Sequence, residues 1–234
     1  MDLFAAPSVW LAMRTFVNLA AMAFAALLFT APQASATPQT DLVASASTTI
    51  DNMRTDPSFG PARNMMDRAR GMLIVPTLIK GGFIFGAEGG NGVLLARTNA
   101  GWSPPAFYTV GSASFGLQAG LEKAQIVMLI MSDRALKAVQ DGDVKLGAGG
   151  GLTIATLSAG AEAATAANLS GDIIIWTSAT GLYGGLTLNG SVISASNEWN
   201  TAYYGRAIPV GDILAGGMRN PGSEPLRQKL SAVR

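Results

Sequence analysis

The strongest constraint on the fold is an alternation of apolar and very small residues that recurs after Gly71. It runs through residues 107–121, 144–154 and 185–192, with Leu, Val, Ile, Phe and Ala on one parity and mostly Gly, Ser, Thr and Gln on the other. Successive side chains of a strand point to opposite faces, so a period of two is typical of strands. The pattern predicts an antiparallel sheet with one core face.

Two short runs are apolar without interruption, at residues 126–131 and 173–176. Runs of this length are typical of strands that are buried on both faces. All 28 glycines lie at or after Gly60, which adds Gly-rich turns between the strands. We therefore predict an α+β fold: a Gly-rich, mainly antiparallel curved sheet, or a partly closed barrel or sandwich.

The small-residue face of the predicted sheet has two interpretations. Glycine has no Cβ, so such a face lets another layer of the protein approach closely or lets strands bend sharply. The same face would equally form a smooth groove for an acyl chain. Tight packing is the simpler interpretation, and both stay open at this point.

Helices are expected before the sheet and between strands. Apolar residues three and four positions apart predict an amphipathic helix over residues 42–53, and residues 61–71 begin with Pro and end with Gly, as a second short helix would. Residues 132–140 and 197–204 are further candidates. After Gly216, Gly and Pro precede a basic end, so residues 217–234 are expected to form a flexible tail.

Composition removes several kinds of chemistry. The chain contains no Cys and no His, which excludes disulfides, thiolate nucleophiles and catalysis by a Ser-His-Asp triad. The net charge of +1 predicts no general attraction to nucleic acid.

Glu88, Asp141 and Asp143 are interpreted as structural carboxylates. The Gly clusters at residues 86–92 and 147–151 lack the Lys and Ser/Thr of a phosphate loop. We predict a protein that is not an enzyme and uses no metal or cofactor.

The amino terminus resembles an export signal. An apolar run at residues 16–29 follows Arg14, and Ala34-Ser35-Ala36 has the small-x-small pattern of a cleavage site, so cleavage is predicted after Ala36. A retained anchor helix is the alternative.

A signal that begins at Met13 would be compact, which suggests that residues 1–12 are a start-site overcall. The mature protein is then periplasmic or secreted, with a helical segment at residues 37–60 and one domain at residues 61–216.

Several short stretches, in a fixed order, carry a resemblance to a known family. They are Lys80-Gly81-Gly82-Phe83-Ile84-Phe85-Gly86, Gly90-Asn91-Gly92-Val93-Leu94-Leu95-Ala96-Arg97, Gly101-Trp102-Ser103-Pro104-Pro105-Ala106-Phe107, Phe115-Gly116-Leu117-Gln118-Ala119-Gly120, Gly181-Leu182-Tyr183-Gly184-Gly185-Leu186-Thr187-Leu188-Asn189-Gly190-Ser191-Val192-Ile193 and Asn200-Thr201-Ala202-Tyr203-Tyr204-Gly205. The match as a whole spans roughly residues 62–215. The chain resembles the SYLF family, also called the Ysc84 actin-binding or lipid-binding domain family, as an exported bacterial member.

The resemblance implies lipid binding, with phosphoinositides bound by eukaryotic members and actin linked to fungal ones. The positions that would contact an anionic headgroup or membrane surface are Arg63, Arg68, Arg70 and Lys80, with Met65, Met66 and Met72 as apolar contacts. A solvated helix face is the alternative for the three arginines. The sequence departs from the family after Ile154, where the Arg of a Gly-Pro-x-Gly-Arg-like turn is missing. We expect a non-catalytic lipid-binding protein of the bacterial envelope, peripherally associated with a membrane. The alternative is a protein-interaction or scaffold module that presents Trp102 and Trp199.

Overall fold

The computed structural model describes residues 37–82, 85–115, 120–147, 151–158, 171–180, 188 and 190–232. The predicted export signal and its alternatives lie outside these residues. None of the described helices is both long and apolar enough to cross a membrane.

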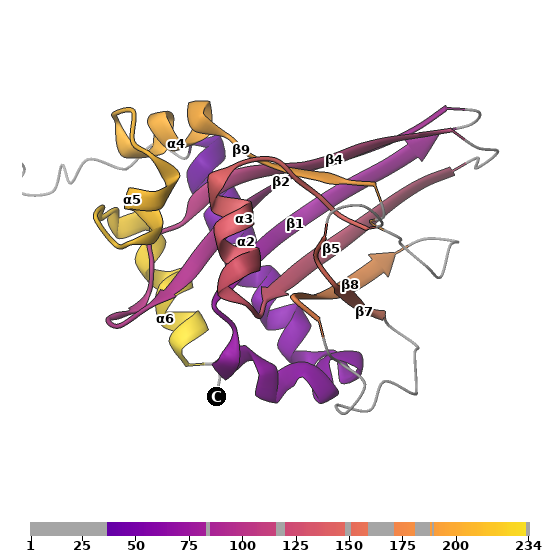
Figure 1. Cartoon of the computed structure of the whole chain (residues 1–234), viewed down its shortest axis with the longest axis horizontal. Helices are drawn as coiled ribbons and strands as arrows, with labels where there is room; N and C mark the ends of the chain where they lie inside the picture. Colours follow the sequence, from indigo (N-terminus) through magenta and orange to yellow (C-terminus); the bar gives the residue numbers. More distant parts are fainter. Residues whose placement is uncertain are drawn as a thin grey trace, which may run out of the picture. The chain divides into compact units, whose positions relative to one another are not determined.

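The described strands form one sheet, in the order β6-β9-β4-β2-β1-β5-β8-β7, with β3 paired to β2 (Figure 1). Their bounds are β1 Gly71–Gly82, β2 Phe85–Thr98, β3 Gly101–Trp102, β4 Ala106–Phe115, β5 Gly120–Ile130, β6 Val144–Lys145, β7 Ile154–Ser158, β8 Ile173–Thr180 and β9 Val192–Ala195. All neighbouring pairs are antiparallel except β7 and β8. The predicted α+β class with a curved, mainly antiparallel sheet is confirmed.

The helices begin and end where the local sequence favours it. Their bounds are α2 Pro38–Thr55, η1 Pro57–Arg68, α3 Asp133–Asp141, α4 Asn197–Tyr204, α5 Val210–Leu214, η3 Pro221–Ser223 and α6 Glu224–Ser231. Thr37 caps α2 in a capping box with Thr40, and the Ser132 hydroxyl caps α3 by accepting a bond from the amide of Ala135. The predicted helices at residues 42–53, 132–140 and 197–204 are confirmed.

The second predicted helix, at residues 61–71, differs from the structure. A 3₁₀ helix occupies Pro57–Arg68 instead, and Gly71 already begins β1. Pro57 and Pro61 lack the amide proton that α-helical bonding needs, and Gly60 lies between them, so a tighter and shorter-range turn is favoured.

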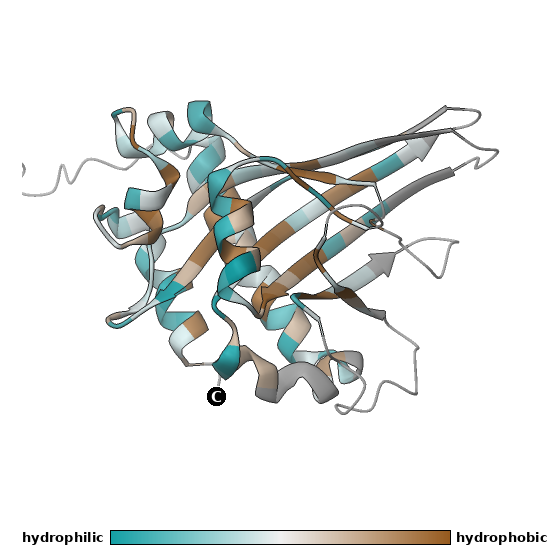
Figure 2. Cartoon of the chain, viewed as in Figure 1, coloured by the Kyte–Doolittle hydropathy of each residue, from teal (hydrophilic) through white to brown (hydrophobic). Residues whose placement is uncertain are grey.

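The sheet is buried on both faces, not on the single core face that the alternation predicts. We call the two faces the α2 face and the α3 face. The α2 face carries Met72, Ile74, Val93, Leu95, Phe107, Val127, Leu129, Ile174 and Trp176, packed against α2, η1, α4 and α6. The α3 face carries Leu73, Val75, Leu94, Tyr108, Ile126, Met128, Ile173 and Ile175, packed against α3, α5 and the segment around Leu146 and Leu188. Figure 2 shows the resulting apolar band across the middle of the strands. The prediction of a single core face is wrong because helices pack on both faces of the sheet.

Two predicted strands are divided in the structure. Residues 107–121 belong to β4, which ends at Phe115, and to β5, which begins at Gly120. In residues 144–154, β6 ends at Lys145 and β7 begins at Ile154. The apolar runs at residues 126–131 and 173–176 do lie in strands buried on both faces, β5 and β8, except that β5 ends at Ile130 and Met131 follows it half-buried.

The carboxyl-terminal segment, expected to be a flexible tail, is an ordered part of the core. Leu226 and Leu230 of α6 are 0% and 2% exposed and pack in the cluster beneath α2. The ammonium group of Lys229 donates to the carbonyl of Ser47 at 3.1 Å and pairs with the carboxylate of Asp51 at 2.5 Å. The sequence of α6 contains only two apolar residues at helical spacing, Leu226 and Leu230. This signal is too weak to predict a helix when Gly and Pro residues precede it.

Strand β1 contains a bulge that matters for the site. Ile74 lies opposite Val93 and Thr77 lies opposite Asn91, so three residues of β1 match two of β2. Pro76 lies within this bulge, where a residue without an amide proton is tolerated. Before the bulge, even-numbered residues of β1 such as Ile74 point to the α2 face. After the extra residue, odd-numbered residues do so, and Thr77 and Ile79 therefore lie on the α2 face.

Candidate functional site

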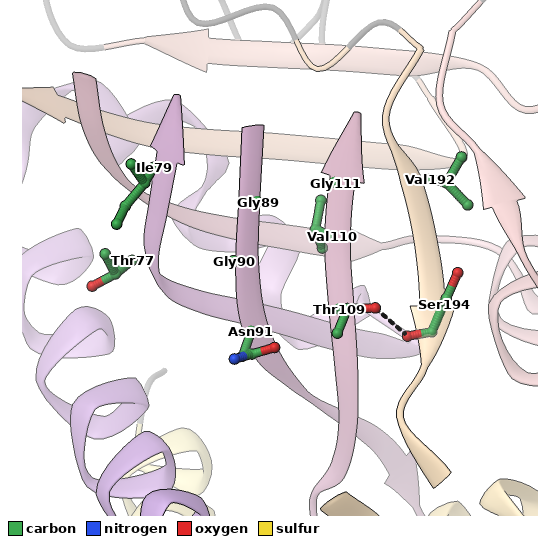
Figure 3. A pocket seen from close by; sticks show the side chains of 10 residues that line it. All are labelled: Thr77, Ile79, Gly89, Gly90, Asn91, Thr109, Val110, Gly111, Val192 and Ser194. Atoms are coloured by element: carbon green, nitrogen blue, oxygen red, sulfur yellow. Dashed lines mark hydrogen bonds between the residues drawn. The ribbon is translucent and has the colours of Figure 1, made fainter. Parts of the chain in front are cut away.

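A groove of about 600 Å³ lies on the part of the sheet beyond the bulge (Figure 3). Its walls and floor come from β1, β2, β4 and β9 and contain only uncharged residues. These residues are Thr77, Ile79, Gly89, Gly90, Asn91, Thr109, Val110, Gly111, Val192 and Ser194.

One row of the groove is polar and crosses four strands. Thr77 pairs with Asn91, Asn91 with Thr109, and Thr109 with Ser194, so the four side chains lie side by side on the α2 face. Thr77 and Thr109 are exposed, whereas Asn91 and Ser194 are half-buried. The Thr109 hydroxyl donates to the Ser194 carbonyl at 3.4 Å. Between described residues, no hydrogen bond engages the side chains of Thr77 and Asn91, which leaves them available to a ligand.

The next row toward the hairpin end is apolar at its ends and open in its middle. Ile79 pairs with Gly89, Gly89 with Gly111, and Gly111 with Val192. The floor of the groove is therefore two strands wide and has no side chains, with Ile79 and Val192 as its walls.

Ile79 is 43% exposed, and in the described part of the chain it is the one large apolar side chain with such exposure. Every other large apolar residue for which exposure is described is buried or half-buried. An exposed isoleucine in the wall of a groove offers apolar surface to a ligand. An apolar group of that ligand is removed from water when it packs there, which is favourable.

The charged side chains of the described residues lie outside the lining of the groove. None of its lining residues is ionisable, and no group of three metal-binding side chains occurs among the described residues. Glu88 is close in sequence but lies on the α3 face, where it is 7% exposed and accepts a hydrogen bond from the Ser191 hydroxyl. This contact attaches the segment before β9 to β2, as a structural carboxylate does.

The cationic residues expected to bind lipid do not form one patch. Arg68 and Arg70 lie exposed at the junction of η1 and β1, and Arg70 pairs with Asp133 at 3.3 Å. Lys80 lies ten residues further along β1, which is roughly 30 Å away at the rise of a strand. Arg63 belongs to η1, but its side chain is outside the described part of the structure.

The methionines proposed as lipid contacts are mainly core residues. Met66 and Met72 are 1% and 0% exposed, and Met65 is half-buried against the same cluster. In this fold Met66 and Met72 have no surface to offer a membrane. The Arg97 guanidinium holds this region together, since it donates to the carbonyls of Met66 and Ala69 at 2.7 and 3.1 Å.

Sequence reasoning did not identify the residues of the groove as a site. The only signal was the Gly, Ser and Thr face, interpreted either as packing or as a smooth groove. Which of these small residues are exposed and which are buried depends on the register between strands, and a single sequence does not reveal that register. The predicted departure from the family pattern at residues 156–161 lies partly outside the described residues.

Fold and groove together define a glycine-rich α+β domain with an open, uncharged groove. The profile of the family described as "Ysc84: Las17-binding protein actin regulator" matches residues 111–233. The chain therefore belongs to the Ysc84, or SYLF, family, which is a family of binding and scaffold domains rather than of catalysts.

Among similar proteins, "LAS seventeen-binding protein 3" of Saccharomyces cerevisiae is 31% identical over 162 residues, which cover 68% of this chain and 35% of that protein. "Protein YSC84" of the same organism is 30% identical over 173 residues, covering 72% and 37%. "SH3 domain-containing YSC84-like protein 1" of Bos taurus is 32% identical over 161 residues, covering 68% and 47%. The matched region is thus between a third and a half of these relatives' length.

Proposed function

We propose that the domain binds membrane lipid without catalysing a reaction, and that it does so in the bacterial envelope. The observation that carries the proposal is the exposed Ile79 in the wall of a groove without charged lining residues. Burial of apolar surface is favourable by about 25 cal/mol per Å², so an acyl chain placed against Ile79 and Val192 gains free energy that water cannot supply.

Arg68 and Arg70 are proposed to add a weaker, electrostatic contribution. Each exposed cation near an anionic membrane contributes about 1 kcal/mol, and the attraction falls off within a Debye length. Such a contribution is lost at high salt, whereas burial of apolar surface is not. The two parts of the proposal are therefore separable.

Co-sedimentation of the full chain with vesicles tests the proposal. Zwitterionic vesicles and vesicles that contain anionic lipid are each compared at low and at high salt. Binding to both kinds that persists at high salt is expected, with an increment on anionic vesicles that salt removes. Failure to sediment with either kind, at either salt concentration, would show that the proposal is wrong.

A protein-interaction function is the second candidate, and the names of the relatives favour it. One is named for binding Las17, and others are named for an SH3 domain that accompanies the YSC84-like region. The groove itself favours lipid, because it contains none of the Trp, Tyr or Arg residues that dominate protein-protein interfaces. A variant Ile79→Asp that loses vesicle binding supports the lipid function directly.

A further inference from the structure

Gly89 is not required by the fold of the described residues. Its φ is not in the left-handed region, and a Cβ built on it meets no atom within 4 Å. Glycine within a strand is unfavourable, since it loses the most backbone freedom on folding and offers no side chain to pack. A larger residue at this position would stabilise the strand, so the absence of a side chain needs another reason.

The neighbouring glycines of the same run are explained by packing. A Cβ on Gly90 would lie 2.5 Å from the carbonyl oxygen of Thr77, and one on Gly92 would lie 2.8 Å from that of Ile74. Both positions face the β1 bulge, whose backbone approaches too closely for any side chain. Gly89 points to the opposite face of the sheet, where nothing in the described structure occupies the space.

A side chain at Gly89 would fill the groove. Gly89 lies in the middle of the open floor, between Ile79 on one side and Gly111 on the other. Adjacent strands are about 4.8 Å apart, so the walls formed by Ile79 and Val192 are separated by three spacings, or roughly 14 Å. The floor is wide enough for a thin, elongated group to lie flat against the backbone.

We propose that this groove binds the uncharged, ester-linked part of a phospholipid, with the first segment of the acyl chains over Gly89 and the ester carbonyls toward Thr77 and Asn91. The inference rests on the proposed lipid-binding function and names the part of the lipid that is recognised. The Asn91 amide and the Thr77 hydroxyl are donors, and an ester carbonyl is an acceptor without charge.

The absence of charged lining residues in the groove favours the ester region of a lipid over its headgroup. Lys123 of β5 lies opposite Ile79, on the outer side of that wall, and has an interaction of its own, whereas no lining residue of the groove is a cation. A phosphate placed on the groove floor would therefore lose hydration without gaining a cationic partner there, which is costly. An ester carbonyl loses much less hydration, and its hydrogen bond to Asn91 replaces one to water. The headgroup then remains in water, so binding by the groove does not depend on which headgroup the lipid carries.

The matched variants Gly89→Val and Gly142→Val test the inference on the full chain. Gly142 also has open space around its Cβ, with an extended φ of 175°, but it lies outside the groove at the end of α3. We expect Gly89→Val to weaken binding to phosphatidylcholine vesicles by about tenfold or more at both low and high salt. Gly142→Val is expected to bind as the parent chain does, and both variants should melt at or above its temperature.

Ether-linked phosphatidylcholine, which has the same headgroup and chains but no ester carbonyl, tests the polar row. The parent chain is expected to bind ester-linked vesicles several-fold more tightly than ether-linked ones, and Asn91→Ala should remove most of that difference. If Gly89→Val binds as well as the parent chain, or if binding occurs only on anionic vesicles at low salt, the groove inference is wrong while lipid binding itself stands. If no vesicle binds the parent chain, the proposed function fails, and with it the inference, in favour of a protein partner.

Discussion

Ile79 of β1 lies directly opposite Gly89 of β2, so an exposed isoleucine side chain stands next to a position that has none. The pair forms one wall of the groove and the adjoining part of its floor. Because neither residue contributes to either buried cluster, the consequences of changing them should be seen in binding and not in stability.

Ile79→Asp should weaken vesicle binding by about tenfold or more, because it places a charge where an acyl chain would be buried. The free energy of unfolding should change by only about 0.5 kcal/mol, as for most surface substitutions. Co-sedimentation and urea denaturation measure the two effects. Ala100→Asp, at an exposed turn outside the groove, is the control. Equal losses in both variants would point to a general effect of charge.

Gly90→Ala should destabilise the protein, because its Cβ would lie 2.5 Å from the Thr77 carbonyl in the β1 bulge. Overpacking of this kind costs about 1–3 kcal/mol. Gly89→Ala, one residue away on the open face, should leave stability unchanged or slightly raised. Chemical denaturation of the two variants side by side decides the matter, and equal stabilities would contradict the assignment of the two faces.

Asn200→Ala should cost about 1–3 kcal/mol. Asn200 is 0% exposed, and its side-chain oxygen accepts a hydrogen bond from the amide of Phe107 at 2.8 Å. Removal of the side chain leaves that buried amide without its partner. Thr201→Ala, on the exposed side of the same helix, is the control and should have little effect on the denaturation midpoint.

Leu226→Ala should cost about 2–5 kcal/mol, as large-to-small changes in a core do. Leu226 is 0% exposed and packs under α2, although sequence reasoning placed it in a flexible tail. Amide hydrogen exchange offers an independent measurement, since α6 should be protected in the parent chain. Fast exchange throughout residues 224–231 would restore the interpretation as a mobile tail.

Stability should fall as the pH rises above about 10, because burial raises the pKa of Tyr203 to about 12. The unfolded chain loses the phenolic proton from about pH 10, where Tyr203 of the folded chain still keeps it, so ionisation favours the unfolded chain over this interval. Tyr203→Phe should show a smaller loss of stability between about pH 9 and pH 12. Denaturant titrations at several alkaline pH values measure this, and an unchanged slope would contradict the role of Tyr203.

Much of the fold was predictable because its signals are local. The cap residues Thr37 and Ser132 and the apolar spacing of residues 42–53 concern neighbours along the chain. The site was less accessible. The basic residues Arg68 and Lys80 seemed to belong together, yet Arg68 ends η1, before β1 begins, and Lys80 lies near the far end of β1. Met66 and Met72 seemed available to lipid, yet they are 1% and 0% exposed in the core of the α2 face.

By itself, the sequence determined a strand-rich α+β fold, since a run that alternates between apolar and small residues gathers its apolar side chains on one face only when it is extended and paired into a sheet. The absence of Cys and His likewise excluded the chemistry that thiolates and imidazoles perform. Tertiary structure decided which glycines pack and which line the groove. The bulge at Pro76 adds one residue to β1 but none to β2, and a shift of one residue moves every later side chain of β1 to the other face. That shift places Ile79 on the open face, and Gly90 against the backbone of the bulge.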